Sequence, residues 1–211
     1  MQLAFRNIIL RDMKPGDEED MVRWMTVQTE WHEHDSPWLA EKDFNGFDPE
    51  KYRRDAREYL RQKKHTGERI NMQIEDRKTG KHIGFVTSYG MDKHCEPQPV
   101  GAEYLYIAVG IDICEPLFRG EHRGTHALLA YMQYVFSFGW PVLFLQTWNG
   151  NQRMMHVARK IGFKFFKVKK GNFEKRGVVY DNLTFYIKKK VFHENFTLGE
   201  RISLRLQALR K

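Results

Sequence analysis

The sequence contains little cysteine and no long apolar run, and each of these absences excludes a class of protein. Only two cysteines occur, Cys95 and Cys114, and their spacing is not that of metal ligands. A disulfide framework and a cysteine-based metal site are therefore not expected, although one disulfide is possible on count alone. The first residues lack the apolar stretch of a signal peptide, and no later run approaches membrane-spanning length. We expect a reduced, cytoplasmic protein that binds neither a membrane nor a metal.

Internal repeats, low-complexity segments and a dividing linker are also missing, so we expect residues 1–211 to form a single domain. The hydrophobic content of 41% and the aromatic content of 14% are typical of a folded protein. The last residues, about 198–211, are basic and place Ile202, Leu206 and Leu209 on one helical face, which predicts a helix. This helix packs on its own domain or, as the alternative, joins two copies, so a monomer and a homodimer both stay open.

The net charge of +8 raises the question of a nucleic-acid partner. Surfaces that bind nucleic acids combine basic residues with an aromatic platform or a recognition helix, and no such pattern occurs in this sequence. A ligand with several phosphate groups, together with ordinary surface lysines, accounts for the excess positive charge. We therefore expect no nucleic-acid partner.

Hydrophobic periodicity and turn residues predict most of the secondary structure. Strands are predicted at Ile8–Asp12, Ile70–Glu75, His82–Tyr89, Val142–Trp148, Phe163–Val168 and Val178–Lys188. Helices are predicted around Met21–Met25, at Glu50–Gln62 and at Asn151–Lys160. The last two strands are expected to join at a turn formed by Lys169–Asn172.

One stretch predicts a binding site for a phosphate-bearing ligand. Residues 104–114 are rich in β-branched and aromatic side chains, which indicates a strand, and Pro116 ends it. A short basic loop with two glycines follows at residues 119–124, and apolar residues at helical spacing begin after Thr125. A helix start presents unpaired N–H groups and a positive dipole end, and glycine lets an anion approach the backbone closely. Arginine adds charge-assisted hydrogen bonds to such an anion.

Three motifs resemble the GCN5-related N-acetyltransferase (GNAT) superfamily. Arg119-Gly-Glu-His122-Arg-Gly124 is similar to the pyrophosphate loop of that family. The stretch from Asn151 to Gly162-Phe163 resembles its asparagine-bearing helix, with the spacing of the branch that contains ribosomal-protein N-terminal acetyltransferases. Residues 180–186 are similar to the closing strand of that branch. The resemblance covers residues of about 6–190. It implies an α/β (α+β) fold with a twisted, mixed but mostly antiparallel sheet of about seven strands and helices on both faces.

The resemblance also implies an acyl-CoA-dependent N-acyltransferase that passes acetyl from acetyl-CoA directly to a primary amine. The acceptor stays open between a peptide N-terminus and a small-molecule amine such as a polyamine or an amino sugar. The strand end and the basic loop are implied to hold the cofactor mainly through backbone groups, with the asparagine facing it from the other side. The implied cofactor-binding residues are Ile113, Cys114, Arg119, Gly120, His122, Arg123, Gly124, Thr125 and Asn151.

The chain departs from the family pattern at three positions. His122 stands where the first loop glycine is usual, so this position requires a backbone conformation that side chains tolerate less well. Ala158 replaces a tyrosine that reprotonates the leaving thiolate in many members, and Met154 replaces a serine of the related branch. Because both familiar general acids are missing, the alternative function is a non-catalytic acyl-CoA-binding or sensor protein on the same fold.

Three carboxylates are candidates for the base that takes the proton of the amine. Asp112 and Glu115 lie nearest to the expected thioester carbonyl, and Glu103 is a further choice upstream. For Asp112 the alternative is a strand-end carboxylate that only orders the loop. Cys114 suggests a covalent acyl-cysteine, but direct transfer is what the resemblance implies.

The segment Glu30–Trp38 has neither helical nor strand periodicity, and it combines aromatic rings with carboxylates. Trp31, Trp38 and Glu30 would suit a cationic amine as the acceptor. The alternative is a surface loop whose tryptophans pack on the core. A metal site is not expected here, because neighbouring ligands rarely complete a coordination sphere. Its candidate ligands would be His32, His34 and Asp35.

Overall fold

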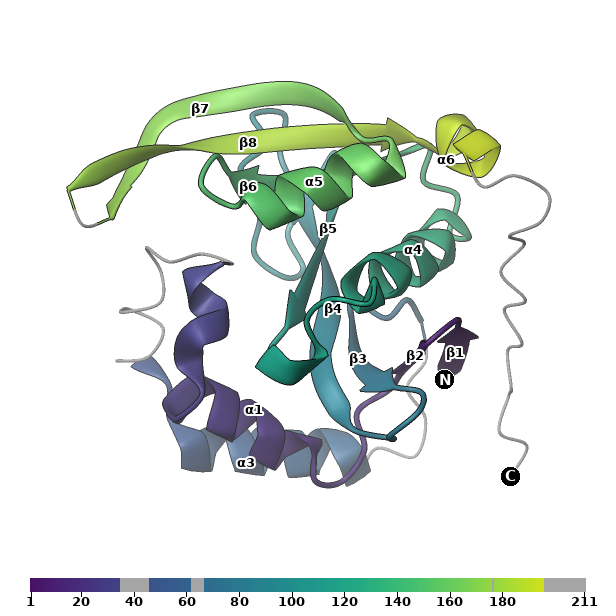
Figure 1. The fold of residues 1–211 in the computed structure, drawn as a ribbon, viewed down its shortest axis with the longest axis vertical. Coiled ribbons are helices and arrows are strands. Elements are labelled where there is room, and N and C mark those ends of the chain that lie inside the picture. Colours follow the sequence, from purple (N-terminus) through teal and green to yellow (C-terminus); the bar gives the residue numbers. More distant parts are fainter. Residues whose placement is uncertain (35–45, 62–66, 176, 196–211) are drawn as a thin grey trace.

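The computed structural model describes residues 1–34, 46–61, 67–175 and 177–195, and these contain one eight-stranded sheet (Figure 1). The sheet order is β1-β2-β3-β4-β5-β6-β8-β7. All neighbouring strands are antiparallel except β5 and β6, which are parallel. The strands are β1 (Gln2–Phe5), β2 (Ile8–Arg11), β3 (Asn71–Asp76), β4 (His82–Met91), β5 (Tyr106–Ile113), β6 (Val142–Trp148), β7 (Lys164–Lys175) and β8 (Val178–Lys188).

The α/β class and the mixed, mostly antiparallel sheet confirm the sequence prediction, whereas the number of strands is one higher than the expected seven. The additional strand is β1, which is only four residues long and pairs with β2 at the sheet edge. Leu3 and Phe5 point into the core, and the burial of their side chains stabilises this short strand. The predicted helix at 198–211 lies outside the described residues.

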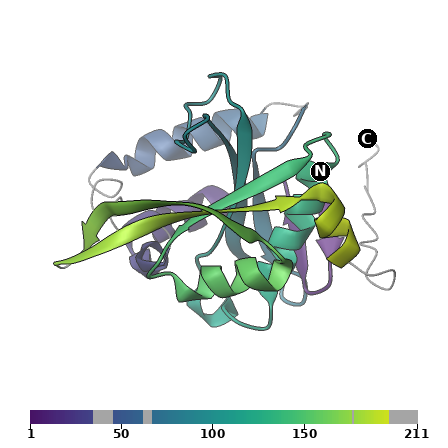
Figure 2. The same ribbon diagram turned by 90° about the horizontal axis from the view of Figure 1, so that it is seen from above.

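Helices cover both faces of the sheet. They are α1 (Asp17–Thr26), α3 (Pro49–Arg61), α4 (Arg123–Phe136), α5 (Gln152–Ile161) and α6 (Lys189–Asn195), with short 3-10 helices η1 (Thr29–Glu33) and η2 (Pro116–Phe118). Figure 2 shows α3 on one side of the sheet and α5 on the other. α1 packs with α3, whereas α4 packs with α5 and with the opposite sheet face. Within the described ranges, no helix has both the length and the apolarity needed to cross a bilayer.

α4 is the central helix of the larger core. Leu128, Tyr131 and Val135 are fully buried at spacings of three and four residues, and Ala130 and Met132 are fully buried as well, so the helix is enclosed on most of its circumference. The Tyr131 hydroxyl is not left unpaired in this apolar setting, because it donates to the carbonyl of Arg69 at 2.8 Å. This packing fixes where α4 begins relative to the end of β5.

β5 and β6 separate from each other along their length. The two strands share only the pair Ala108–Phe144. β5 nevertheless stays paired with β4 as far as Ile113, and β6 stays paired with β8 as far as Trp148. Beyond the shared pair the two strands therefore diverge, and the backbone groups that face the gap take no part in a ladder. The candidate site lies in this gap.

β7 and β8 form a long hairpin that extends beyond the body of the sheet (Figure 1). The predicted turn at Lys169–Asn172 is wrong, because β7 continues to Lys175 and stays paired with β8. The register shifts within that stretch, and the Gly171 amide donates to Asp181 Oδ1 at 2.9 Å. Glycine and asparagine here belong to a β-bulge, whose local composition resembles that of a turn.

Candidate active site

A cavity of about 550 Å³ lies where β5 and β6 diverge. Its walls are the end of β5 (Gly110–Ile113), the loop before α4 with the first turn of that helix, and one face of α5. Trp31 and His34, in and just after η1, also line it. The site therefore combines segments that lie far apart in the sequence, and the divergence of the two parallel strands creates the space between them.

The loop before α4 offers a row of unpaired backbone donors. Three successive residues, 120–122, have left-handed backbone conformations, with φ of +100°, +46° and +61°. In residues 119–126 of the loop and the first turn of α4, the amides of Arg119, Arg123 and His126 donate to backbone carbonyls. Within the described chain no acceptor is assigned to the amides of Gly120, Glu121, His122, Gly124 and Thr125. Consecutive N–H groups at a helix start form a concave anion-binding site.

Arg119 adds a guanidinium group to this row of donors. Its Nε donates to the carbonyl of Ile113 at 3.1 Å, which fixes the side chain against the end of β5. Its Nη2 is buried and has no hydrogen-bond partner within the described chain. A buried donor without a partner is costly, so such a group indicates a ligand. The loop amides, the dipole of α4 and this guanidinium together fit a pyrophosphate group.

The loop is held in place from outside the cavity. Asn7 donates from Nδ2 to the carbonyl of Glu121 at 2.9 Å, and its Oδ1 lies 2.7 Å from His126 Nδ1. Arg123 directs its guanidinium to Asp76 at 2.7 Å and does not line the cavity. Arg123 therefore supports the loop instead of reaching the cavity with its side chain. The part played by Asn7 had no sequence signal, because it depends on β1 and β2 meeting the loop in space.

Ile113 and Cys114, at the end of β5, differ in whether they reach the cavity. Ile113 lines the cavity, as expected of a cofactor-binding residue. The Cys114 side chain is fully buried beside Trp24 and Trp31, outside the cavity lining. Its amide donates to the carbonyl of Ile83 in β4 at 2.9 Å and is not available to a ligand. This placement corrects the expected cofactor contact of Cys114 and gives no support to an acyl-cysteine.

Asn151 caps α5 and also lines the cavity. Its Oδ1 accepts a hydrogen bond from the Met154 amide at 2.9 Å, which satisfies a donor of the first helical turn. Its Nδ2 donates to the carbonyl of His34 at 2.5 Å, and Trp148 Nε1 donates to the same carbonyl at 3.2 Å. Asn151 thus ties the segment after η1 to the start of α5.

The two positions at which a general acid is usual, Ala158 and Met154, differ in whether they line the cavity. Ala158 is fully buried on the core-facing side of α5, whereas Met154 of the same helix lines the cavity. α5 contains no serine, threonine or tyrosine, so this helix supplies no hydroxyl to the cavity. His156 lines the cavity from the same helix.

Asp112 and Trp31 line the cavity from the α1 side of the sheet. Asp112 pairs with Phe85 in the β4–β5 ladder, and directly opposed residues project from the same sheet face. The Trp31 ring meets the Phe85 ring edge-on, with centroids 5.8 Å apart. Trp31 Nε1 donates to the carbonyl of Trp24 at 3.0 Å, which anchors the ring. A carboxylate and an aromatic wall therefore share one end of the cavity.

The other residues of the predicted acceptor segment are distributed differently. His34 lines the cavity, whereas Glu30 is exposed and does not. Burial lowers the pKa of His32 to about 4, so this imidazole is neutral at pH 7, and it does not line the cavity. Trp38 and Asp35 lie outside the described residues.

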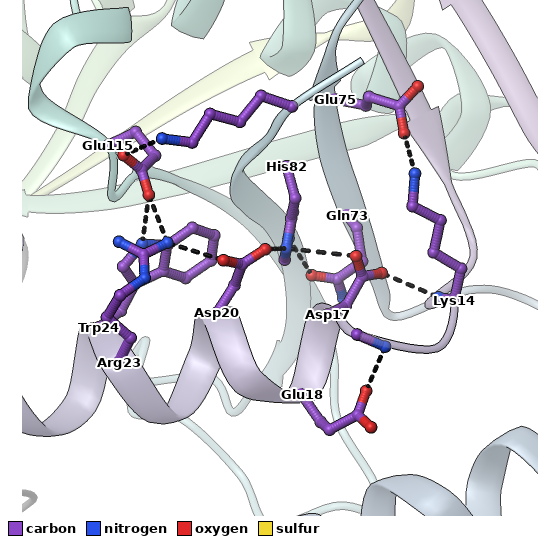
Figure 3. Close-up of polar contacts among 12 residues, drawn as sticks. Lys14, Asp17, Glu18, Asp20, Arg23, Trp24, Gln73, Glu75, His82 and Glu115 are labelled. Atoms are coloured by element: carbon purple, nitrogen blue, oxygen red, sulfur yellow. Dashed lines mark hydrogen bonds and ion pairs between the residues drawn. The ribbon is translucent and has the colours of Figure 1, made fainter.

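Glu115 does not line the cavity but lies in a buried polar network (Figure 3). Its carboxylate accepts hydrogen bonds from Arg23 at 2.6 Å, Trp24 at 3.0 Å and Lys81 at 3.0 Å. Burial alone would raise the pKa of Glu115, but these three donors outweigh burial and hold the pKa below its ordinary value. A carboxylate held ionised by three donors is a poor proton acceptor. Glu103 is exposed before β5 and does not line the cavity either.

The same network docks α1 against the sheet (Figure 3). Arg11 makes two hydrogen bonds to Asp17, at 2.5 and 2.9 Å. His82 Nδ1 lies 3.1 Å from Asp20 Oδ2, and its Nε2 lies 3.0 Å from Gln73 Oε1. Asp17, Asp20 and His82 converge as metal ligands would, but a guanidinium already neutralises one of these carboxylates. The network positions α1 and, through it, the cavity wall formed by η1.

Comparison with known proteins decides the family. The chain matches the family model described as an acetyltransferase (GNAT) domain over residues 7–164. The protein belongs to the GNAT acetyltransferase family. A comparison with curated proteins gives no match.

Solved structures of GNAT proteins share the fold. An acetyltransferase (GNAT family) from Bacillus anthracis aligns with a TM-score of 0.64 at 13% identity, covering 90% of this chain and 99% of that chain. RimL, a ribosomal L7/L12 α-N-protein acetyltransferase in complex with coenzyme A, aligns with a TM-score of 0.63 at 13% identity, covering 89% and 98%. A ribosomal-protein-alanine N-acetyltransferase from Brucella melitensis aligns with 0.59 at 16% identity, covering 85% and 98%. At these identities the likeness concerns the fold alone.

Proposed function

We propose that this GNAT protein is an acetyl-CoA-dependent N-acetyltransferase that passes the acetyl group directly to a primary amine. The proposal rests on one observation: the loop that is suited to bind an anion and the carboxylate of Asp112 line the same cavity. Arg119 and the loop amides form one part of its wall, and Asp112 and Trp31 form another. Acetyl-CoA supplies an activated acetyl thioester. The residues of the chain bind and orient the cofactor and the amine, and they remove the proton of the amine.

The cofactor would be held mainly by the backbone. The amides of the loop and Arg119 bind the pyrophosphate. Strand backbone groups alternate between the two edges, and the Cys114 amide is used by β4. The amides of Ile111 and Ile113 therefore face the gap beside β6. There they can bond the pantetheine arm and polarise the thioester carbonyl.

Asp112 is the proposed general base. It is the one carboxylate among the described residues that line the cavity, and it lies on the same sheet face as the Trp31 wall. An amine acceptor arrives largely protonated at pH 7, so a nearby carboxylate both attracts it and removes its proton. Because α5 supplies no hydroxyl, we assign the return of a proton to the thiolate to water.

For the acceptor we propose a polypeptide N-terminus first and a small-molecule amine second. The first choice is supported by the spacing from Asn151 to Gly162 and by two structural neighbours whose names specify ribosomal-protein acetylation. Both acceptor classes suit an aromatic wall beside a carboxylate.

The experiment is a thiol-release screen with acetyl-CoA against peptides with unblocked N-termini, polyamines and aminoglycosides. We expect one class to release free coenzyme A thiol in proportion to acetylated product, identified by mass spectrometry. Ala158 and Met154 favour a second candidate, a non-catalytic acyl-CoA sensor, which would bind acetyl-CoA but release no thiol with any amine. Absence of acetyl-CoA binding would contradict both functions.

A further inference from the structure

The cavity contains more positive groups than a pyrophosphate requires. Arg119 and the loop amides form one part of the wall, and α5 adds Arg153, His156 and Lys160 to the cavity lining. Spacings of three and four residues place these side chains on one face of the helix. Arg159, their neighbour in sequence, is exposed and does not line the cavity. The basic stripe is therefore a property of the face that α5 turns to the cavity.

α5 also runs along the cavity from one end to the other. At its start, Asn151 contacts the carbonyl of His34 at 2.5 Å, beside the Trp31 wall. Near its end, Lys160 Nζ lies 3.2 Å from Nδ1 of His122 in the phosphate-binding loop. These two contacts are about 14 Å apart along the helix axis. Lys160 is thus the α5 cation at the phosphate end of the cavity.

The contact between Lys160 and His122 leaves a hydrogen-bond donor on each side chain available to an anion. An ammonium group has donors only, so His122 Nδ1 acts as the acceptor and its Nε2 carries the proton. Both residues are exposed, and no carboxylate within the described chain pairs with either. Two donors from two different elements therefore meet at the edge of the cavity without a counter-ion.

We propose that Lys160 and His122 bind the 3′-phosphate of the coenzyme A nucleotide, an inference that rests on the proposed function. The loop amides and Arg119 suffice for the pyrophosphate, which leaves the ammonium of Lys160 and the imidazole of His122 for the third phosphate group. A phosphate monoester carries about −1.5 to −2 charges at pH 7 and three acceptor oxygens. It can therefore accept hydrogen bonds from the ammonium and the imidazole together. The consequence is selection of acetyl-CoA over the analogue that lacks the 3′-phosphate.

The test measures the dissociation constants of coenzyme A and 3′-dephospho-coenzyme A by calorimetry for the full-length protein and its variants. We expect the native protein to prefer coenzyme A by roughly tenfold or more, because hydrogen bonds to a charged group are lost with the phosphate. Lys160→Met should reduce this preference about tenfold and leave 3′-dephospho-coenzyme A binding unchanged. His122→Gly should reduce it about threefold, because glycine keeps the left-handed backbone and the pyrophosphate amides.

Arg159→Met is the matched control, since it removes the same charge from the same helix outside the cavity. It should leave the preference at the native value. The inference is overturned if Lys160→Met weakens both ligands equally or changes neither, and also if Arg159→Met reproduces its effect. Those results leave the proposed function standing, because coenzyme A still binds. If the native protein bound neither compound, the proposed function and this inference would both fail.

Discussion

Asp112 carries the proposed chemistry because of the strand position that it occupies. Its side chain shares a sheet face with Phe85 and Trp31, whereas the neighbouring Ile111 and Ile113 pack toward α4. A shift of one residue in register would turn the carboxylate to the core side. The sequence alone left Asp112, Glu115 and Glu103 as alternatives, since burial and ion pairing are not visible in it.

We expect Asp112→Asn to lower kcat by about a hundredfold to ten-thousandfold, because the amide keeps the shape but cannot accept a proton. Binding of acetyl-CoA should change little, since the cofactor contacts are expected from the backbone. Raising the pH should restore part of the rate as the acceptor amine loses its proton without help. Steady-state kinetics from pH 6 to 9 with the acceptor found in the screen will measure this.

Glu103→Gln is the control for Asp112→Asn, because Glu103 is exposed outside the cavity lining. It should turn over like the native protein. A collapse of activity in Glu103→Gln together with native turnover in Asp112→Asn would show that the base is assigned to the wrong carboxylate.

At the scale of elements, the docking of α1 positions the cavity wall that we propose as the acceptor side. Glu115 accepts hydrogen bonds from Arg23 and Trp24 of this helix, and α1 leads directly into η1 and Trp31. The pKa of Glu115 is held below its ordinary value by these contacts. Its stabilising effect is therefore complete above the ordinary glutamate pKa and is lost as the pH falls through the lowered value.

We expect Glu115→Gln to reduce the free energy of unfolding by about 1–3 kcal/mol at pH 7, because charge-assisted hydrogen bonds are replaced by weaker ones. The difference from the native protein should shrink in acid, as the pH falls through the lowered pKa of Glu115 and the native carboxylate becomes protonated. Urea denaturation at several pH values will measure it.

Glu58→Gln is the surface control, since Glu58 pairs with Arg61 at 3.2 Å and both side chains are mostly exposed. It should change the stability by less than about 0.5 kcal/mol. A Glu115→Gln effect that is equally small, or one that grows in acid, would show that the network does not hold α1 in the way inferred.

Elements with a strong local pattern were predictable, whereas those defined by distant contacts were not. Val142–Trp148 and Val178–Lys188 agree with β6 and β8 residue by residue, because stretches rich in β-branched and aromatic residues identify strands. The bulge at Gly171 resembled a turn, since both favour glycine and asparagine. β1 and the support from Asn7 depend on tertiary pairing, which no local pattern reveals.

The candidate site shows the same division. The basic loop and the left-handed backbone at His122 followed from the glycine pattern, and the backbone conformation agrees with a φ of +61°. The contact of Asn151 with the carbonyl of His34 and the pairing of Arg123 with Asp76 could not be read from the sequence. Each depends on an element that folding brings alongside, namely the segment after η1 and the end of β3.

At the scale of the whole molecule, one splayed pair of strands joins the proposed phosphate-binding loop to the proposed acceptor surface. The net charge of +8 agrees with a protein that binds a polyanionic cofactor. At 13% identity to a coenzyme A-bound neighbour, the fold is shared, but the side chains at the cavity are this chain's own. Cofactor binding is therefore the property that connects fold, site and function.

The most direct measurement of this property is the melting temperature with and without acetyl-CoA, for the native protein and for Gly124→Glu. A ligand at about 100 times its Kd stabilises the native state by about 2.7 kcal/mol, which raises Tm by roughly 5–10 °C. In Gly124→Glu a Cβ meets only ordinary contacts at 3.7 and 3.9 Å, so the fold should persist while the new carboxylate repels pyrophosphate. We expect a shift for the native protein and none for the variant. An unshifted native Tm, or an equal shift in both proteins, would contradict the assignment of the cofactor loop.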